Sequence, residues 1–215
     1  MARRDMGLEA RARTRVSPGA IALSFDDGPD PVWTGRILAE LERHGAVATF
    51  FVDARRALLQ TDLIAAMREG GHEIGFHCFR HIRHSELGED GVRADVAAGL
   101  TVLDSLGVRP TAWRAPWGVI TEATVRAAAE HDLELWNWSF DSHDWRGDGA
   151  ERMLAALALG RHSGGTVALM HDGLGPGARR DGCAETVRLT AALLSMASAN
   201  GLRPVPLSVA VGEAP

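Results

Sequence analysis

The chain has 215 residues, of which 46% are apolar and 24% charged, and its formal net charge is −5. This composition is typical of one folded soluble domain and excludes a disordered chain. The negative charge argues against the basic face of a nucleic-acid-binding protein, and no run of about 18 apolar residues predicts a membrane span.

Residues 1–16 are an arginine-rich extension ahead of a single predicted domain, 17–215. The extension lacks the apolar stretch that a secretory signal requires. Cys78 and Cys183 do not supply the disulfide framework of a small secreted domain. We therefore expect a cytoplasmic protein with no nucleic-acid or membrane partner, and the oligomeric state stays open.

Short apolar runs alternate with helical patterns along the chain. In chain order, the predicted strands cover 19–25, 46–52, 72–76, 111–113, 133–138, 166–170 and 203–209. The predicted helices cover 31–44, 55–70, 89–106, 121–131, 149–160 and 184–199. This alternation predicts βαβ units and a parallel sheet, either closed into a barrel or left open and doubly wound.

Unusual polar residues cluster where the predicted strands end. The clusters are Asp26–Asp27, HCFRH at 77–81, RAPWG at 114–118, DSHDW at 141–145 and HDG at 171–173. In parallel α/β folds the chemistry gathers beyond the carboxyl ends of the strands. Five clusters in phase are hard to explain as solvated surface, so the pattern predicts one shared site.

His77 and His81 are four residues apart, and a helical turn would place both imidazoles on one face. Two imidazoles with one carboxylate suit Zn²⁺ and leave positions for water and substrate. For an isolated pair, a polar helix start with incidental histidines is the commoner explanation. A carboxylate from another strand end, Asp26 or Asp27, would favour the metal site.

Asp26 and Asp27 follow an apolar strand directly, which argues against a simple solvated turn. If both bound metal, no base would remain to activate a water, and if both stayed free they would repel. The economical arrangement places one acid on the metal and leaves the other as a base. The residues alone do not say which is which.

Two further clusters offer groups for acid–base chemistry. Arg114 could hold a carboxylate in its ionised form, or it could form an ordinary salt bridge. His171 stands at a strand end, where its pKa suits proton donation, although a lone histidine there is more often structural. A carboxylate from DSHDW, Asp141 or Asp144, would raise the pKa of a neighbouring His171.

These five clusters, in this order, resemble the motifs of the polysaccharide deacetylase family (the NodB homology domain, carbohydrate esterase family 4). SFDDGP stands for the family's TFDDGP, HCFRH for HSxxH or HTxxH, and RAPWG for RxPYG. DSHDW fits DxxDW, and LMH fits the closing LxH. The resemblance implies an α/β fold in the form of a distorted, incomplete (β/α) barrel that spans the single domain.

The resemblance also implies a metal-dependent N-deacetylase that frees acetate and an amine from an N-acetylglucosamine-containing substrate. By this resemblance, the metal ligands are Asp27, His77 and His81. The metal is one divalent ion, with Zn²⁺ preferred and Co²⁺ or Ni²⁺ as alternatives. The implied partner is a small carbohydrate or amino-sugar substrate.

The matched motifs imply an acid–base pair with a supporting residue for each member. Asp26 would be the general base that activates water, and Arg114 would orient it. His171 would be the general acid that protonates the leaving amine, and Asp141 would orient it.

Further matched positions imply the walls of the site. The backbone N–H of Trp117, where the family usually has tyrosine, would help to stabilise an oxyanion. Trp145 and Leu169 would line the acetyl pocket. Cys78 departs from the family's serine or threonine, which leaves the bracing of this loop open and introduces a soft ligand near the metal.

The motifs resemble short chitooligosaccharide deacetylases more than secreted wall-modifying members. A tailoring enzyme for an amino-sugar natural product fits the same features. The alternatives are a hydrolase of a non-sugar amide or cyclic imide on the same scaffold, and a non-catalytic sugar-binding domain. Arg179 and Arg180, in a glycine-rich loop beside His171, could meet an acidic group of the substrate or be solvated.

Overall fold

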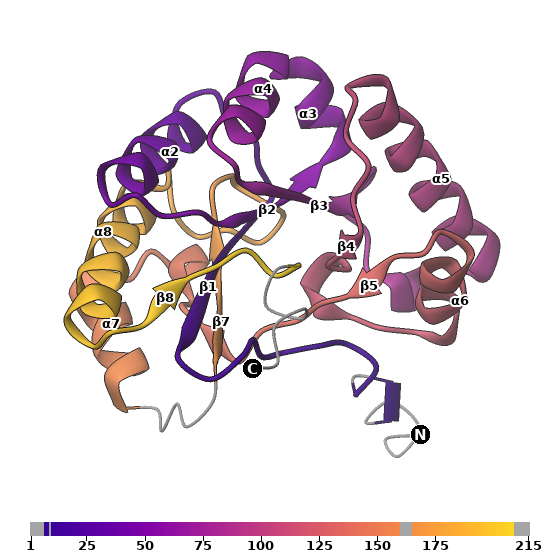
Figure 1. Cartoon of the computed structure of the whole chain (residues 1–215). Coiled ribbons are helices and arrows are strands. Elements are labelled where there is room, and N and C mark those ends of the chain that lie inside the picture. Colours follow the sequence, from indigo (N-terminus) through magenta and orange to yellow (C-terminus); the bar gives the residue numbers. More distant parts are fainter. Residues whose placement is uncertain (1–6, 9, 160–164, 209–215) are drawn as a thin grey trace.

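A parallel β-sheet forms the inner layer of the protein, and helices surround it on the outside (Figure 1). The computed structural model describes residues 7–8, 10–159 and 165–208. Within them, neighbouring strands follow the order β5-β4-β3-β2-β1-β7-β6, and every pairing is parallel. No helix in these ranges is both long enough and apolar enough to span a bilayer.

The strands are β1 (Ala20–Asp26), β2 (Thr49–Asp53), β3 (Glu73–Cys78), β4 (Ala112–Trp113), β5 (Glu134–Leu135), β6 (Phe140–Asp141), β7 (Thr166–His171) and β8 (Arg203–Pro204). The α-helices are α2 (Trp33–Arg43), α3 (Ala54–Leu59), α4 (Thr61–Glu69), α5 (Glu89–Ser105), α6 (Glu122–Glu130), α7 (Ala150–Leu159) and α8 (Ala184–Ala199). Three short 3₁₀ turns complete the elements: η1 (His84–Glu86), η2 (Pro116–Gly118) and η3 (Asp144–Arg146).

The barrel is open between β5 and β6, which form the two edges of the sheet in the described part of the chain. The last strand, β8, pairs with Ala20 and Ile21 at the start of β1, on the edge that β2 covers further along. All helices lie on the outer side of the strands (Figure 1). The expected incomplete (β/α) barrel is therefore confirmed, and a closed barrel or a doubly wound sheet is excluded.

The helix predicted over 55–70 is two helices, α3 and α4. They meet at Gln60, whose φ of −128° and ψ of 50° interrupt the helical backbone. The side chain of Asp53 caps the first of them by accepting hydrogen bonds from the backbone N–H groups of Arg55 and Arg56. The apolar spacing continues across the break, so periodicity alone could not reveal it.

The last third of the sheet also differs from the prediction. The strand predicted over 133–138 forms a ladder only at β5, with one isolated bridge between Trp136 and Arg13. The next two-residue strand, β6, pairs with β7 instead. Two residues are too few to show a strand period. The strand predicted over 203–209 is paired only at β8. Residue 209, and residue 160 of the helix predicted over 149–160, lie outside the described residues.

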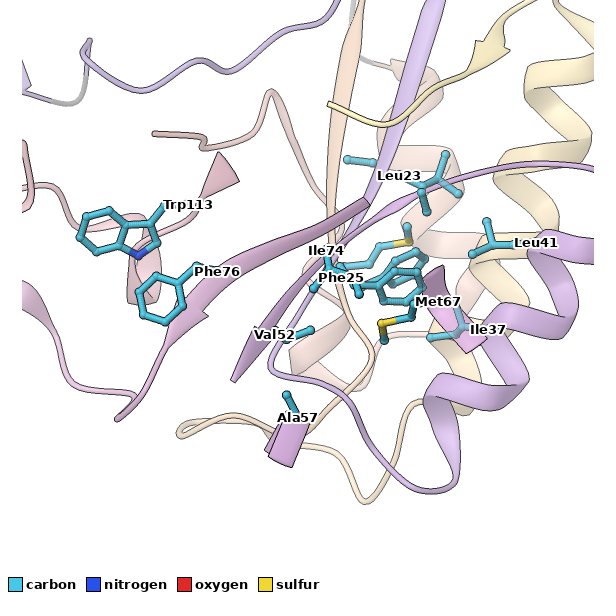
Figure 2. Close-up of a cluster of buried hydrophobic side chains, with 14 of the residues drawn as sticks. Leu23, Phe25, Ile37, Leu41, Val52, Ala57, Met67, Ile74, Phe76 and Trp113 are labelled. Carbon is cyan, nitrogen blue, oxygen red and sulfur yellow. The ribbon is translucent and has the colours of Figure 1, made fainter. Parts of the chain in front are cut away.

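The first strand is buried on both faces, which explains its continuous apolar sequence. Ile21, Leu23 and Phe25 face the helices, where Phe25 stacks on Phe50 with ring centroids 5.1 Å apart. Figure 2 shows Leu23 and Phe25 gathered with side chains from the covering helices, and Phe76 with Trp113 further along the sheet. This layer fixes β1, and with it the strand end that carries the two aspartates.

The opposite face of β1 has smaller side chains. Ala20 and Ala22 pack in a second buried cluster, together with Phe51 and Trp136. Ser24, in the same alternation, donates a hydrogen bond to the carbonyl of Ala168 and accepts one from Arg114. Small residues on this face leave room for the Arg114 side chain inside the barrel.

Candidate active site

The carboxyl ends of the strands surround one cavity of about 360 Å³. Its size is within the range of about 300–1,000 Å³ that is typical of small-molecule sites. The predicted site residues that line it are Asp26, Asp27, His77, His81, Trp117, Asp141, Trp145, Leu169 and His171. The remaining one, Arg114, is completely buried and reaches Asp26. The structure therefore brings the ten predicted residues together around one cavity.

Asp26 and Asp27 meet different partners because the backbone changes direction between them. Asp26 ends β1 and lies beside His171 of β7 in the strand register. Asp27 has a φ of 71°, in the left-handed region that is unfavourable for residues with side chains. Its carboxylate faces His77 and His81, whereas the Asp26 carboxylate faces Arg114. The two aspartates therefore have separate partners, as expected, because the left-handed backbone at Asp27 turns its carboxylate away from that of Asp26.

Asp27, His77 and His81 form a cluster in which the ligating atoms all lie within 4.8 Å of one another. Oδ1 of Asp27 is 3.4 Å from Nε2 of His77 and 3.1 Å from Nε2 of His81. Burial raises the pKa of Asp27, but hydrogen bonds from the two histidines outweigh burial and hold the pKa well below its usual range. An ionised carboxylate with two imidazole nitrogens fits a divalent metal ion such as Zn²⁺.

His77 is oriented by the backbone of the neighbouring strand. Its Nδ1 donates to the carbonyl of Arg114 at 2.7 Å, which leaves Nε2 as the nitrogen that can bind a metal. His77 lies in β3, and His81 lies in the loop after it, so the two do not share a helical turn. The loop brings His81 back toward the strand end, where its ring packs edge-on against Trp117.

A buried carboxylate on α5 braces the loop that carries His81. Asp95 accepts hydrogen bonds from the backbone N–H groups of Phe79 and Arg80, each at 2.9 Å. Cys78 is 1% exposed, and burial raises the pKa of its thiol well above the usual range. It belongs to no potential metal cluster in the described residues, so the structure does not support the soft ligand considered from the sequence. Asp95 supplies the bracing that the sequence left open at Cys78.

Arg114 connects Asp26 to the interior of the barrel. Its Nη1 donates to Oδ1 of Asp26 at 2.7 Å and to Oγ of Ser24 at 2.9 Å, while Nη2 donates to the carbonyl of Asn137. Its guanidinium carbon lies 4.3 Å from the centre of the Phe51 ring. Burial lowers the pKa of Arg114 and Asp26 opposes this shift, so the guanidinium keeps its charge. The predicted contact between Arg114 and Asp26 is present.

His171 forms the opposite wall from a different strand and has its own charge network. Its Nδ1 is 2.7 Å from Oδ1 of Asp144, and its backbone N–H donates to Oδ2 of the same carboxylate. Burial lowers the pKa of His171, but the Asp144 charge outweighs burial and raises the pKa to about 9. The imidazole is therefore protonated at neutral pH, as a general acid requires.

The prediction that Asp141 orients His171 is wrong, because His171 bonds a different aspartate. The second aspartate of DSHDW, Asp144, occupies that place, because η3 turns it under His171. Asp141 lines the cavity and accepts a hydrogen bond from the backbone N–H of His143 at 2.8 Å. His143 has a φ of 55°, and this left-handed residue separates the directions of the two aspartates.

Arg180 completes the network below His171. It donates to Oδ2 of Asp144 at 2.9 Å and to the carbonyl of His171 at 3.0 Å, and its side chain is 6% exposed. Thr186 of α8 donates to the same carboxylate oxygen at 2.7 Å. Arg179, by contrast, is exposed and lies near Trp145. The adjacent arginines therefore have different environments, which the sequence could not separate.

Arg56 is a site residue that the sequence did not reveal. Its Nη1 donates to the carbonyl of Asp27, and its Nη2 donates to the carbonyl of Leu174, both at 2.8 Å. A Cβ atom at Gly173 would collide with the carbonyl of Asp27, and one at Gly175 would collide with the Asp27 carboxylate. Arg56 thus ties the turn at Asp27 to the glycine-rich loop that packs on it.

The family model for polysaccharide deacetylases matches residues 13–136 of this chain. A peptidoglycan-N-acetylglucosamine deacetylase of Bacillus cereus is 34% identical over 155 residues, which cover 71% of this chain and 72% of that protein. A chitooligosaccharide deacetylase of Bradyrhizobium sp. is 31% identical over 196 residues, which cover 87% of this chain and 89% of that protein. Both relatives are aligned over most of their length.

The fold has a match among solved structures as well. The crystal structure of the Bc1960 peptidoglycan N-acetylglucosamine deacetylase superimposes with a TM-score of 0.84 at 27% identity. The superposition covers 96% of this chain and 95% of that one. That structure is a complex with 4-naphthalen-1-yl-N-oxidanyl-benzamide.

Proposed function

Because this chain belongs to the polysaccharide deacetylase family, we propose that it hydrolyses the acetamide of an N-acetylglucosamine-containing substrate to acetate and a free amine. The observation that carries the proposal is the composition of the cavity. It combines a cluster fitted for a divalent metal with a carboxylate, Asp26, and a protonated imidazole, His171, on adjacent strands.

We assign the metal to Asp27, His77 and His81, and we propose Zn²⁺ as the ion on the basis of its two imidazole nitrogens and one carboxylate oxygen. When bound, such an ion acts as a Lewis acid toward the acetamide carbonyl and lowers the pKa of water. The Bc1960 structure is a complex with a hydroxamic acid, a chelating group, which supports a metal-dependent reaction.

Hydrolysis breaks the C–N bond of the acetamide, adds the water oxygen to the acetyl carbon and requires a proton on the nitrogen. We assign to Asp26 the role of accepting a proton from the attacking water, since Arg114 bonds its Oδ1 and leaves Oδ2 for this role. We assign to His171 the role of donating a proton from Nε2 to the leaving amine, since its Nδ1 is bonded to Asp144. The two proton transfers balance the reaction.

We propose that the backbone N–H of Trp117 stabilises the negative charge that develops on the carbonyl oxygen. Trp117 has a φ of 56° inside η2, so its peptide group is held in an unusual direction at the cavity wall. Trp145 and Leu169 line the same cavity and offer apolar contacts for the acetyl methyl group.

The test is an acetate-release assay on metal-free protein with and without added Zn²⁺, Co²⁺ or Ni²⁺. The substrates are chitooligosaccharides of graded length, together with simple N-acetyl amides. Ring opening of a cyclic imide, which releases no acetate, is followed separately by chromatography. We expect metal-dependent acetate release from the saccharides. Turnover of the non-sugar compounds alone would contradict the proposed substrate, and indifference to chelation would contradict a metal-dependent reaction.

Asp26→Asn tests the base separately from the metal. We expect the variant to bind metal as the wild type does, because Asp26 is outside the ligand cluster. Its turnover should fall by about 10²–10⁴-fold, the usual contribution of a general base. A near-normal rate would remove Asp26 from this role.

A further inference from the structure

Two arginines line the cavity, and their positive charges are balanced to different extents by neighbouring carboxylates. Arg180 is bonded to Asp144 and is almost fully buried, so its charge belongs to the network below His171. Arg83 has a side chain that is 42% exposed, and its ion pair with the exposed Glu86 is long, at 3.9 Å. Such a contact contributes little in water. Arg83 is therefore a lining cation whose charge is available to a ligand.

Arg83 is held in place by an aromatic ring rather than by a carboxylate. Its guanidinium carbon lies 4.4 Å from the centre of the Trp117 ring, and Trp117 in turn packs on His81. Stacking removes water from one face of the guanidinium and restricts its rotation. The free edge of a fixed guanidinium presents paired N–H donors that match a carboxylate or phosphate.

A second tryptophan of the cavity, Trp145, has the same kind of neighbour. The guanidinium carbons of Arg146 and Arg179 lie 4.9 Å and 5.8 Å from the centre of the Trp145 ring. Both side chains are exposed, and neither forms an ion pair within the described part of the chain. Trp117 follows β4 and Trp145 follows β6, on opposite sides of β1 in the strand order. On both arms of the sheet, arginine thus lies beside a tryptophan of the cavity, in a protein whose net charge is −5.

The carboxylates of the cavity do not cancel this charge. Asp26 is paired with Arg114, and Asp27 is in contact with the two histidines of the metal cluster. Asp141 lines the cavity from β6, the arm opposite to Trp117 in the strand order. An anionic group therefore has a favourable position beside Arg83 and an unfavourable one beside Asp141.

We propose that the substrate is an N-acetylated amino sugar that carries an anionic group, a carboxylate or a phosphate, and that Arg83 on Trp117 binds this group. The inference rests on the proposed deacetylase function and adds the substrate's charge. Arg83 acts as a specificity residue, because it favours anionic over neutral saccharides with the same acetamide.

The experiment measures kcat/KM for two matched pairs of substrates on the zinc-loaded enzyme. One pair is N-acetylglucosamine and its 1-phosphate, and the other is N,N′-diacetylchitobiose and the disaccharide of N-acetylglucosamine with N-acetylmuramic acid. We expect the anionic member of at least one pair to be preferred about tenfold, which is typical of one charge-assisted hydrogen-bonded contact. The pair that shows the preference identifies phosphate or carboxylate as the source.

Arg83→Gln should reduce this anionic-to-neutral ratio about tenfold, and Arg83→Lys should retain part of it, because lysine keeps the charge without the planar fork. Salt at about 1 M should weaken the preference in the wild type. The matched control is Arg36→Gln. Arg36 also lies over a tryptophan, 4.7 Å from the Trp33 ring centre, but neither residue lines the cavity. This control should keep the wild-type ratio.

Equal rates on neutral and anionic partners in both pairs would overturn the inference, and so would a preference that survives Arg83→Gln. Either result leaves the proposed function intact as long as some saccharide releases acetate in the presence of metal. Failure of every saccharide, neutral and anionic, would instead contradict the proposed function itself.

Discussion

The two halves of the cavity are stabilised in different ways. In the metal half, the functional atoms of Asp27, His77 and His81 point toward one another, and other atoms anchor two of these residues. Nδ1 of His77 is anchored on the carbonyl of Arg114, and the carbonyl of Asp27 is anchored by Arg56. These anchors orient the ligating atoms without taking part in the ligand cluster.

In the proton-donor half, the charges are already matched inside the protein. The Asp144 carboxylate accepts hydrogen bonds from His171, Arg180 and Thr186. Burial raises the pKa of Asp144, but the charges of His171 and Arg180 outweigh burial and lower it from its usual value. This half therefore holds a protonated imidazole with no help from a ligand, whereas the metal half is arranged around one.

This difference predicts which property a substitution in each half should change first. A change in the metal half should appear first as weaker metal binding, because the anchors serve the ligand geometry. A change in the proton-donor half should appear first as an altered pH profile, because Asp144 sets the pKa of His171. Three substitutions separate these responses.

The largest effect is expected for His77→Ala, which removes one metal ligand. Losing a hydrogen-bond partner of a metal ligand typically lowers metal affinity by about 10–100-fold. Zinc affinity of His77→Ala, measured by competition with a coloured chelator, should fall further than this. Acetate release should fall with it. The pKa of His171, followed by NMR, should stay high because the partner that raises it most, Asp144, remains in place.

His44→Ala is the matched control for this change. His44 is exposed, and its ring nitrogen bonds the carbonyl of Glu40 far along the chain from the metal cluster. It should bind zinc as the wild type does. Full zinc affinity in His77→Ala would rule out the assigned cluster.

Asp144→Asn should have a smaller effect on rate and a distinct effect on pH dependence. The wild-type acid is lost as the pH rises through about 9, where His171 gives up its proton. Without the Asp144 charge and hydrogen bond, burial lowers the pKa of His171 and only the charges of Asp27 and Asp26 oppose it, so the pKa should move down from about 9. The basic limb of the kcat profile should shift with it, while zinc affinity stays close to that of the wild type.

The same pair links stability to pH. The pKa of His171 is higher in the folded protein than its ordinary value of 6.5, so the pair stabilises the fold fully below that pH. This contribution to stability is lost as the pH rises through about 9, and it is absent from Asp144→Asn.

Asp141→Asn is the matched control for the pH profile. The basic limb of its kcat profile should keep the wild-type position. If the basic limb moved in Asp141→Asn and not in Asp144→Asn, Asp141 would be the residue that orients His171, as the motif implied.

The sequence was sufficient for the parts of the molecule that repeat a simple pattern. The alternation of apolar runs and helices predicted the parallel sheet, and polar residues at the strand ends predicted one cavity. The HCFRH and DDGP segments predicted the candidate metal cluster, although the family resemblance was needed to choose Asp27 and the helical turn considered for His77 and His81 is absent.

The rest depends on backbone geometry and on distant contacts. A positive φ at His143 decides whether Asp141 or Asp144 reaches His171, and histidine adopts this conformation too seldom for the sequence to reveal it. Arg179 and Arg180 are adjacent and identical, yet α8 and η3 bury one of them and leave the other exposed. Arg56 lies in a region that reads as an ordinary amphipathic helix.

The smallest effect, and the sharpest test of the comparison, is expected for Arg56→Gln. Glutamine is too short to bond the carbonyls of Asp27 and Leu174 together, so the strained turn at Asp27 loses the contact that ties it to the glycine-rich loop. Zinc affinity should fall by about 10–100-fold, as for other outer contacts of metal ligands. The basic limb of the pH profile should stay near 9, because Asp144 and His171 are untouched.

Arg55→Gln is the matched control, since Arg55 is the adjacent arginine of α3 and its side chain is 54% exposed. It should retain the zinc affinity and melting temperature of the wild type. If Arg56→Gln bound zinc as tightly as Arg55→Gln, the hydrogen bond from Arg56 to the carbonyl of Asp27 would not be needed to orient the ligand, and the prediction would be wrong. If instead its basic limb moved, the two halves of the cavity would be coupled through the loop, and their separate responses would no longer hold.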